Sequence, residues 1–242
     1  MQSEYHSWPS ARLGRDAGLV AYGHWGTPAL VFPTRGGDEW EMARQGLIAA
    51  LAEHIDAGRV KIFTVSGTGQ DSFSNTAVPP LERSAAQMRY DDYVRHEVLP
   101  FIRQHCESPD IPVTTIGMAF GAFHAANTLF KQPDVVNRCY ALSGIYDMKR
   151  FMDGTFDDNF YFNNPVDYLA NLEDPELIAQ ISSCEIRLAT GDGPWEDKGP
   201  TYRLAEVLQG KQIRHALDDW GAMGGHDWPY WKHQMREYLN RV

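Results

Sequence analysis

The chain has little cysteine, no excess of basic residues and no long apolar run. Only three of its 242 residues are cysteines, Cys106, Cys139 and Cys184, too few and too scattered for a disulfide framework or a cysteine-based zinc site. The formal net charge of −10 argues against a nucleic-acid partner, because phosphate-binding surfaces need clustered Lys and Arg. The longest apolar runs have the length of strands, which predicts no membrane span. Residues 1–6 lack the basic-then-apolar pattern of a secretory signal. The few free cysteines favour a cytoplasmic location, although a mature secreted protein would have a similar sequence.

Apolar, β-branched runs alternate with helical patterns along the chain, and no internal repeat or low-complexity linker separates them. The expected strands are residues 19–22, 29–32, 60–65, 113–116, 139–142, 186–189 and 213–217. The expected helices are residues 40–55, 90–104, 122–130, 202–208 and 228–239. Such alternation predicts an α/β fold with a mostly parallel sheet covered by helices on both faces, formed by one domain over residues 1–242. The first two strands are close in sequence and are expected to pair antiparallel.

Residues 151–175 form the one long interruption of this alternation and are rich in aromatic and acidic side chains. The segment follows the strand at 139–142, close to the edge where ligands bind in parallel sheets. We expect a lid or one wall of a substrate pocket, although a surface excursion held by its own aromatics would have the same composition.

The chain also lacks a serine where its most informative motif requires one. Residues 117–121 read Gly-Met-Ala-Phe-Gly between a strand and a helix, which is the frame of the nucleophile elbow G-x-S-x-G. The flanking Gly117 and Gly121 let the strand and the helix approach closely. Ala119 occupies the central position, and its methyl group has no oxygen with which to attack a substrate. The pattern therefore predicts a hydrolase scaffold that is inactive as written.

A histidine late in the chain is the expected partner of this position. In such hydrolases the order is nucleophile, acid, histidine, and His226 lies in the glycine-rich stretch 221–228 after the last predicted strand. Its expected role is general base toward the nucleophile and then general acid toward the leaving group. His215 is the nearby alternative, but it falls inside the predicted strand and is expected to be structural.

The acid that orients this histidine is expected in the loop after residues 186–189. Three carboxylates compete there, Asp192, Glu196 and Asp197. Asp192 is close to the end of the strand, whereas Glu196 and Asp197 lie one turn further along. We favour Glu196 and leave the other two open, since an unused carboxylate would be a loop charge or a helix cap.

An oxyanion hole needs two backbone N–H groups. One is expected from Phe120, directly after the nucleophile position. The other is expected from the loop after residue 32, where Arg35 or Gly36 is the candidate donor. A plain glycine turn leading into the next helix is the alternative for that loop.

Metal and cofactor motifs are not found in the sequence. The stretch from His96 to Pro100 begins like a zinc motif, but Pro100 stands where the second histidine is required. We therefore expect neither a metal site nor a cofactor. The expected partner is a small-molecule ester or acyl substrate, and the sequence leaves a homo-oligomer open.

Motifs along nearly the whole chain resemble those of the putative esterase family of α/β hydrolases, the esterase D-like group. They are Phe-Pro-Thr at 32–34, Arg-Tyr at 89–90, Glu-Val-Leu-Pro at 97–100, Gly-Met-Ala-Phe-Gly-Ala-Phe-His-Ala-Ala-Asn at 117–127, Leu-Ser-Gly-Ile-Tyr-Asp at 142–147, Tyr-Phe-Asn-Asn-Pro-Val-Asp-Tyr at 161–168 and His-Asp-Trp-Pro-Tyr-Trp at 226–231. The resemblance implies an α/β-hydrolase fold and carboxylester or thioester hydrolysis, or acyl transfer. It places the nucleophile role on position 119 and the base on His226, and it leaves the acid open.

Ala119 departs from the pattern of that family, and two accounts explain it. In the first, an esterase-type enzyme carries an engineered serine-to-alanine replacement, and the remaining site is intact. In the second, the chain is a natural pseudo-esterase that binds a ligand or supports a partner without covalent chemistry. The first account is favoured here, because the glycines, the late histidine and an available acid are all present.

Overall fold

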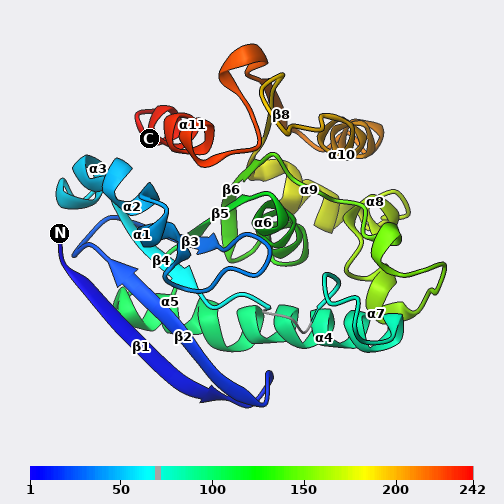
Figure 1. The fold of residues 1–242 in the computed structure, drawn as a ribbon, viewed down its shortest axis with the longest axis horizontal. Helices are drawn as coiled ribbons and strands as arrows, with labels where there is room; N and C mark the ends of the chain where they lie inside the picture. The colour runs from blue at the N-terminus through cyan, green and yellow to red at the C-terminus, as the bar shows by residue number, and fades with distance from the viewer. Residues whose placement is uncertain (69–71, 242) are drawn as a thin grey trace.

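The computed structural model describes residues 1–68 and 72–241, which contain an eight-stranded sheet of order β1-β2-β4-β3-β5-β6-β7-β8 (Figure 1). The strands are β1 (Ser3–Ser10), β2 (Arg15–Tyr22), β3 (Thr27–Phe32), β4 (Val60–Val65), β5 (Val113–Met118), β6 (Val136–Leu142), β7 (Glu185–Thr190) and β8 (Ala216–Asp219). Strands β3 to β8 run parallel to one another, whereas β2 is antiparallel to both β1 and β4. The predicted α/β class with a mostly parallel sheet is confirmed.

Both faces of the sheet are buried because successive strand residues point to opposite sides. In β3, Leu30 and Phe32 join one apolar cluster, while Ala29 and Val31 join the other. Most of the helical residues in the first cluster come from α4 (Pro80–Tyr93), α5 (Leu99–His105), α6 (Phe120–Lys131), α9 (Pro175–Ser183) and α10 (Gly199–Gly210). Those in the second come from α2 (Leu47–Ala50), α3 (Ala52–Asp56) and α11 (Trp228–Leu239), with Met42 of α1 (Glu41–Arg44). Parallel strands buried on both sides explain the continuous apolar runs of the sequence.

Several predicted elements differ from the structure. The strand at 19–22 does not pair with that at 29–32, because β4 lies between β2 and β3 and the antiparallel partners of β2 are β1 and β4. The single helix expected at 40–55 is three short helices, and Gly46, with φ +78°, ends the first of them.

The helix expected at 90–104 begins ten residues earlier, with α4 at Pro80, and continues into α5 through a π-helical turn, η1 (Val94–Val98). The last strand, β8, is shorter than expected and starts at Ala216. His215 therefore lies just before the strand rather than inside it, and its Nδ1 lies 2.9 Å from the carbonyl oxygen of Ile213.

The aromatic segment after β6 packs against the start of α6. It contains the short helices η2 (Lys149–Phe151), α7 (Asp158–Tyr161) and α8 (Pro165–Tyr168). Met152 and Phe160 of this segment are buried in one cluster with Phe120 and Phe123 of α6. In Figure 1, α7 and α8 lie at the end of the molecule away from β1 and β2. The segment therefore borders the turn that contains Ala119.

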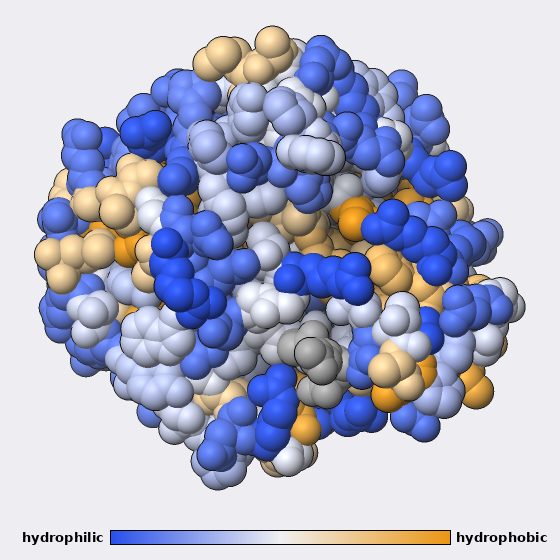
Figure 2. Space-filling model, viewed as in Figure 1, coloured by the Kyte–Doolittle hydropathy of each residue, from blue (hydrophilic) through white to orange (hydrophobic). Residues whose placement is uncertain are grey.

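The surface is mostly polar on the face of the molecule that Figure 2 draws. Figure 2 shows a face on which hydrophilic residues predominate and hydrophobic ones lie in separate small groups. No helix among residues 1–68 and 72–241 is long and apolar enough to cross a membrane.

Candidate active site

The turn between β5 and α6 holds Ala119 in a strained backbone conformation. Its φ of 53° and ψ of −116° are rare for a residue with a Cβ and cost about 1–3 kcal/mol. All six residues of β5 are buried, and the N–H of Ala119 donates to the carbonyl of Leu142 at 3.0 Å. Strand, sharp turn and helix follow one another as the sequence motif predicts.

Both flanking glycines are needed for this turn. A Cβ on Gly117 would overlap the backbone carbonyl of Gly121. A Cβ on Gly121 would lie 2.5 Å from the carbonyl oxygen of Phe32 and 2.7 Å from that of Pro33. Helix α6 therefore packs with its first turn directly against the loop that follows β3.

That loop forms a tight turn with two N–H groups at its tip. The N–H of Gly37 donates to the carbonyl of Thr34 at 3.0 Å, and Gly36 has the positive φ, +75°, that a type II turn requires at its third position. Arg35 and Gly36 are the central residues, so their N–H groups do not close the turn. Phe120 is the first residue of α6, and its N–H has no partner within the helix. The predicted donors, Phe120 and Arg35, thus come from two segments in contact.

A buried carboxylate fixes the position of this turn. Glu41 accepts hydrogen bonds from the backbone N–H of Thr34 at 2.7 Å and from its Oγ1 at 2.6 Å. Hydrogen bonds to a charged acceptor are stronger than neutral ones, so Glu41 anchors the turn to α1. The sequence analysis missed this residue, since its only signal is an acid seven positions after Thr34.

Two loops at the far side of the site are joined by backbone hydrogen bonds. Asp192 N–H donates to Gly221 O at 2.7 Å, Gly193 N–H to Gly224 O at 2.7 Å, and His226 N–H to Pro194 O at 3.0 Å. The glycines make this possible, because a Cβ on Gly193 would lie 2.6 Å from Gly224 O. The loop after β7 is therefore held in register with the loop after β8.

This register brings Glu196 to His226. The Nδ1 of His226 lies 3.9 Å from Oε2 of Glu196, whose side chain is 1% exposed. Thr190 Oγ1 donates to the other oxygen, Oε1, at 2.7 Å, while Oε2 has no hydrogen-bond partner among the described residues. A buried carboxylate oxygen without a partner is costly, and His226 offers a ring N–H beside it. With Nδ1 turned to Glu196, Nε2 is the nitrogen left to accept a proton.

The other two candidate acids lie away from the histidine. Asp192 is 62% exposed and forms an ion pair with Lys198. Asp197 accepts the backbone N–H of Gly199 at 3.0 Å, at the start of α10. Of the three carboxylates, the geometry favours Glu196.

Burial lowers the pKa of His226 below its usual value, and the nearby carboxylates of Glu196 and Asp227 only partly oppose this. The imidazole is therefore neutral at physiological pH, which is the form that can accept a proton.

Trp231 connects the histidine to the centre of the sheet. Its ring meets that of His226 edge-on, with centroids 5.2 Å apart, and its Nε1 donates to Ser143 Oγ at 3.0 Å. Trp231 and Ala119 belong to the same apolar cluster, together with Leu142 and Ala189. Position 119 and His226 thus both lie at the carboxyl edge of the parallel strands. The contacts of Trp231 and Thr190 carry no sequence signal beyond their closeness to the predicted residues.

The comparisons with known proteins agree with this architecture. Residues 38–242 match the model of a family described as putative esterase. No curated protein sequence is similar enough to the chain to match it.

Solved structures of esterases and hydrolases share the fold. One is a ferulic acid esterase, with a TM-score of 0.75 and 14% identity over 98% of this chain and 96% of the other. An S-formylglutathione hydrolase from Agrobacterium tumefaciens has a TM-score of 0.70 and 13% identity over 98% and 93% of the two chains. A fluorophosphonate-binding serine hydrolase from Staphylococcus aureus has a TM-score of 0.68 and 15% identity over 99% and 97%. The predicted α/β-hydrolase fold is confirmed.

Proposed function

The chain belongs to the putative esterase family, and from this premise we propose that its site is that of a serine-type carboxylester or thioester hydrolase or acyl transferase whose nucleophile is replaced by Ala119. The observation that carries the proposal is the backbone of Ala119. A backbone with φ 53° and ψ −116°, outside the left-handed helical region, persists only where the surrounding structure imposes it, and such strain collects at functional positions. The proposed substrate is a small-molecule ester or acyl compound.

With serine at 119, the chemistry follows from the groups around the turn. The serine oxygen would attack the carbonyl carbon of the substrate while Nε2 of His226 takes the hydroxyl proton. The carbonyl oxygen, now negative, would accept hydrogen bonds from the N–H groups of Phe120 and Arg35. His226 would then give its proton to the leaving alcohol or thiol as that bond breaks. Water would repeat the two steps on the acyl-enzyme and release the acid.

Glu196 is proposed to orient His226 and to stabilise its protonated form. The 3.9 Å gap between Oε2 and Nδ1 is longer than a hydrogen bond, as is common in sites without substrate. Closing the gap would satisfy the buried oxygen and the imidazole N–H together. Residues 151–175 are proposed as one wall of the pocket, because Met152 and Phe160 pack on Phe120.

The chain with Ala119 is proposed to be inactive, as an engineered serine-to-alanine variant of such an enzyme. The alternative is a natural pseudo-esterase that binds an acyl ligand at the same place. A single domain over residues 1–242 and a cytoplasmic location stay predictions.

The test is Ala119→Ser, assayed with short p-nitrophenyl esters and with a fluorophosphonate probe. We expect kcat/KM to rise by about 10⁴-fold or more, because the loss of a nucleophile costs this much in triad hydrolases. Activity should persist below pH 6.5 and fall only as His226, whose pKa is lowered, becomes protonated. Ala119→Gly is the matched control, since it relieves the backbone strain at position 119 without adding an oxygen atom. A folded serine variant that reacts with neither reagent would contradict the enzyme account and leave the pseudo-esterase.

A further inference from the structure

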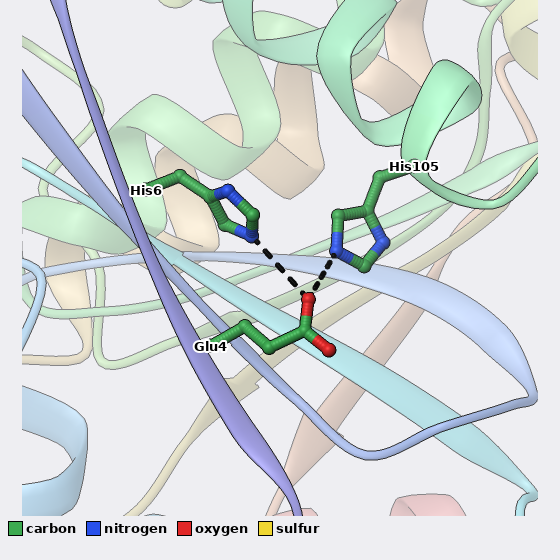
Figure 3. A group of neighbouring side chains, drawn as sticks. All are labelled: Glu4, His6 and His105. Atoms are coloured by element: carbon green, nitrogen blue, oxygen red, sulfur yellow. Dashed lines mark hydrogen bonds and ion pairs between the residues drawn. The ribbon is translucent and has the colours of Figure 1, made fainter.

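Two histidines and a glutamate lie close together between strand β1 and the end of helix α5, away from the candidate active site. Glu4 and His6 lie two residues apart on β1, so their side chains share one face of this edge strand. His105 is the last residue of α5. Figure 3 shows the three side chains converging from the strand and from the end of the helix. The sequence analysis found no metal site because the third residue comes 101 positions after the first.

The distances among these side chains suit a small divalent cation. Oε2 of Glu4 lies 3.6 Å from Nε2 of His6 and 3.2 Å from Nε2 of His105. The three ligand atoms all lie within 4.8 Å of one another. Tetrahedral zinc with bonds of about 2.0–2.1 Å holds its ligand atoms about 3.3–3.4 Å apart, so little movement would be needed to enclose it.

Two of the ligand atoms are bonded to each other, since Nε2 of His105 and Oε2 of Glu4 form a hydrogen bond at 3.2 Å, which an ion bound between them would replace. Gln2 Nε2 donates to Oε1 of Glu4 at 2.7 Å, which turns the other oxygen, Oε2, toward the histidines. Nε2 of His6 is buried and has no hydrogen-bond partner among the described residues. The ring of Phe101 lies against both imidazoles, with centroids 4.9 Å from that of His6 and 5.6 Å from that of His105. Apolar surroundings of this kind strengthen a cation–ligand interaction.

We propose that Glu4, His6 and His105 form a binding site for a divalent transition-metal ion of the zinc type, which fastens the edge strand β1 to the end of α5. Two imidazoles and one carboxylate are a donor set that zinc accepts with one further position left open. Since α5 leads into β5, His105 lies toward the amino ends of the parallel strands. The site is therefore separate from the carboxyl edge that carries Ala119 and His226, and its role is structural. Lys61 lines the same cavity as His105, and its positive charge repels a cation bound there.

The experiment is a calorimetric titration of the full chain, first freed of metal with a chelator, with Zn²⁺ alone. We expect one ion per chain. Glu4→Gln and His105→Ala should each weaken binding by about 100-fold, as for the loss of a strong metal contact. His96→Ala is the matched control, because His96 also faces a carboxylate, that of Asp92 at 3.9 Å, but belongs to no group of three ligands among the described residues. Its affinity should stay within about twofold of the parent.

Two further readouts keep the test decisive if His105→Ala folds poorly. Glu4→Gln changes an exposed side chain of the same size, and Zn²⁺ should raise the melting temperature of the parent but not of this variant. Co²⁺ should give visible absorption bands with the parent that Glu4→Gln lacks. Equal zinc affinity in the parent and in folded Glu4→Gln, or no saturable binding below about 1 mM, would overturn the proposal.

Discussion

His124, buried in the first turns of α6, makes the stability of the protein depend on pH. Its side chain is 5% exposed and packs among aromatic rings, with centroids 4.8 Å from Tyr90 and 5.3 Å from Phe120. Gln87 Nε2 lies 3.4 Å from its Nδ1 and can donate to it when the ring is neutral. Burial lowers the pKa of His124 from 6.5 to about 3. We predict that His124→Leu removes a large part of the acid sensitivity of the fold.

The magnitude follows from proton binding in the two states. The folded pKa lies below the unfolded one, so the unfolded chain binds the proton first, and stability is full above pH 6.5 and lost as the pH falls. At about pH 5 an unfolded histidine with a pKa of 6.5 is protonated roughly 30 to 1, while the folded one is still neutral. The loss is then RT ln 30, about 2 kcal/mol. This figure barely changes for any folded pKa below about 4.

The assay is urea unfolding of the parent and the variant at two pH values, about 7.5 and about 5. At the higher pH, His124→Leu should be the less stable, by about 1–3 kcal/mol, because Gln87 loses a partner. At the lower pH this difference should shrink by about 2 kcal/mol. His96→Leu is the control, since His96 is 44% exposed and its replacement removes a histidine without removing a buried imidazole. A difference between parent and His124→Leu that is the same at both pH values would refute the reasoning.

Two further predictions concern the geometry of the site. In the Ala119→Ser background, Glu196→Gln should lower kcat by about 10⁴-fold. Asp192→Asn changes an exposed carboxylate paired with Lys198, and its kcat should stay within about twofold of the parent. Equal losses of kcat in the two variants, measured by steady-state kinetics, would mean that Glu196 is not the acid. Gly121→Ala should destabilise the protein by about 1–3 kcal/mol in urea unfolding, because its Cβ would meet the carbonyl of Phe32 at 2.5 Å. Gly210→Ala, in a helix with nothing within 4 Å of the new Cβ, should be neutral or stabilising, and a similar cost at both glycines would contradict the steric argument.

The central strands could be predicted from the sequence because they are buried on both faces. Each of β3 to β7 is rich in apolar or β-branched residues, and the alternation of such segments with helical patterns indicates parallel crossovers. β1 escaped prediction because it is an edge strand whose residues are mostly exposed, so it has no apolar run. The breaks at Gly46 and at the π-turn 94–98 depend on local backbone geometry, which hydrophobic periodicity does not report.

The candidate site divides in the same way. The elbow was predictable because its close backbone contacts require glycine at 117 and 121, and these glycines can be recognised in the sequence. The choice among Asp192, Glu196 and Asp197 could not be settled from the sequence, because it depends on the register between two loops. That register is set by backbone hydrogen bonds, which any residue can make. The supports from Glu41, Thr190 and Trp231 escaped for the same reason, since each contact joins residues whose separation in sequence has no characteristic pattern.

The supports of the site also bear on the meaning of Ala119. The turn is set by the glycine contacts, the oxyanion loop by Glu41, and His226 by the paired loops and Trp231. None of these interactions uses an atom that serine would have and alanine lacks. Replacing the hydroxyl by hydrogen therefore removes the reacting atom but leaves the surrounding contacts and the backbone strain unchanged. Whichever account of the alanine holds, the pocket keeps its shape. Ala119→Ser, which adds one oxygen atom, therefore distinguishes an inactivated enzyme from a protein that only binds.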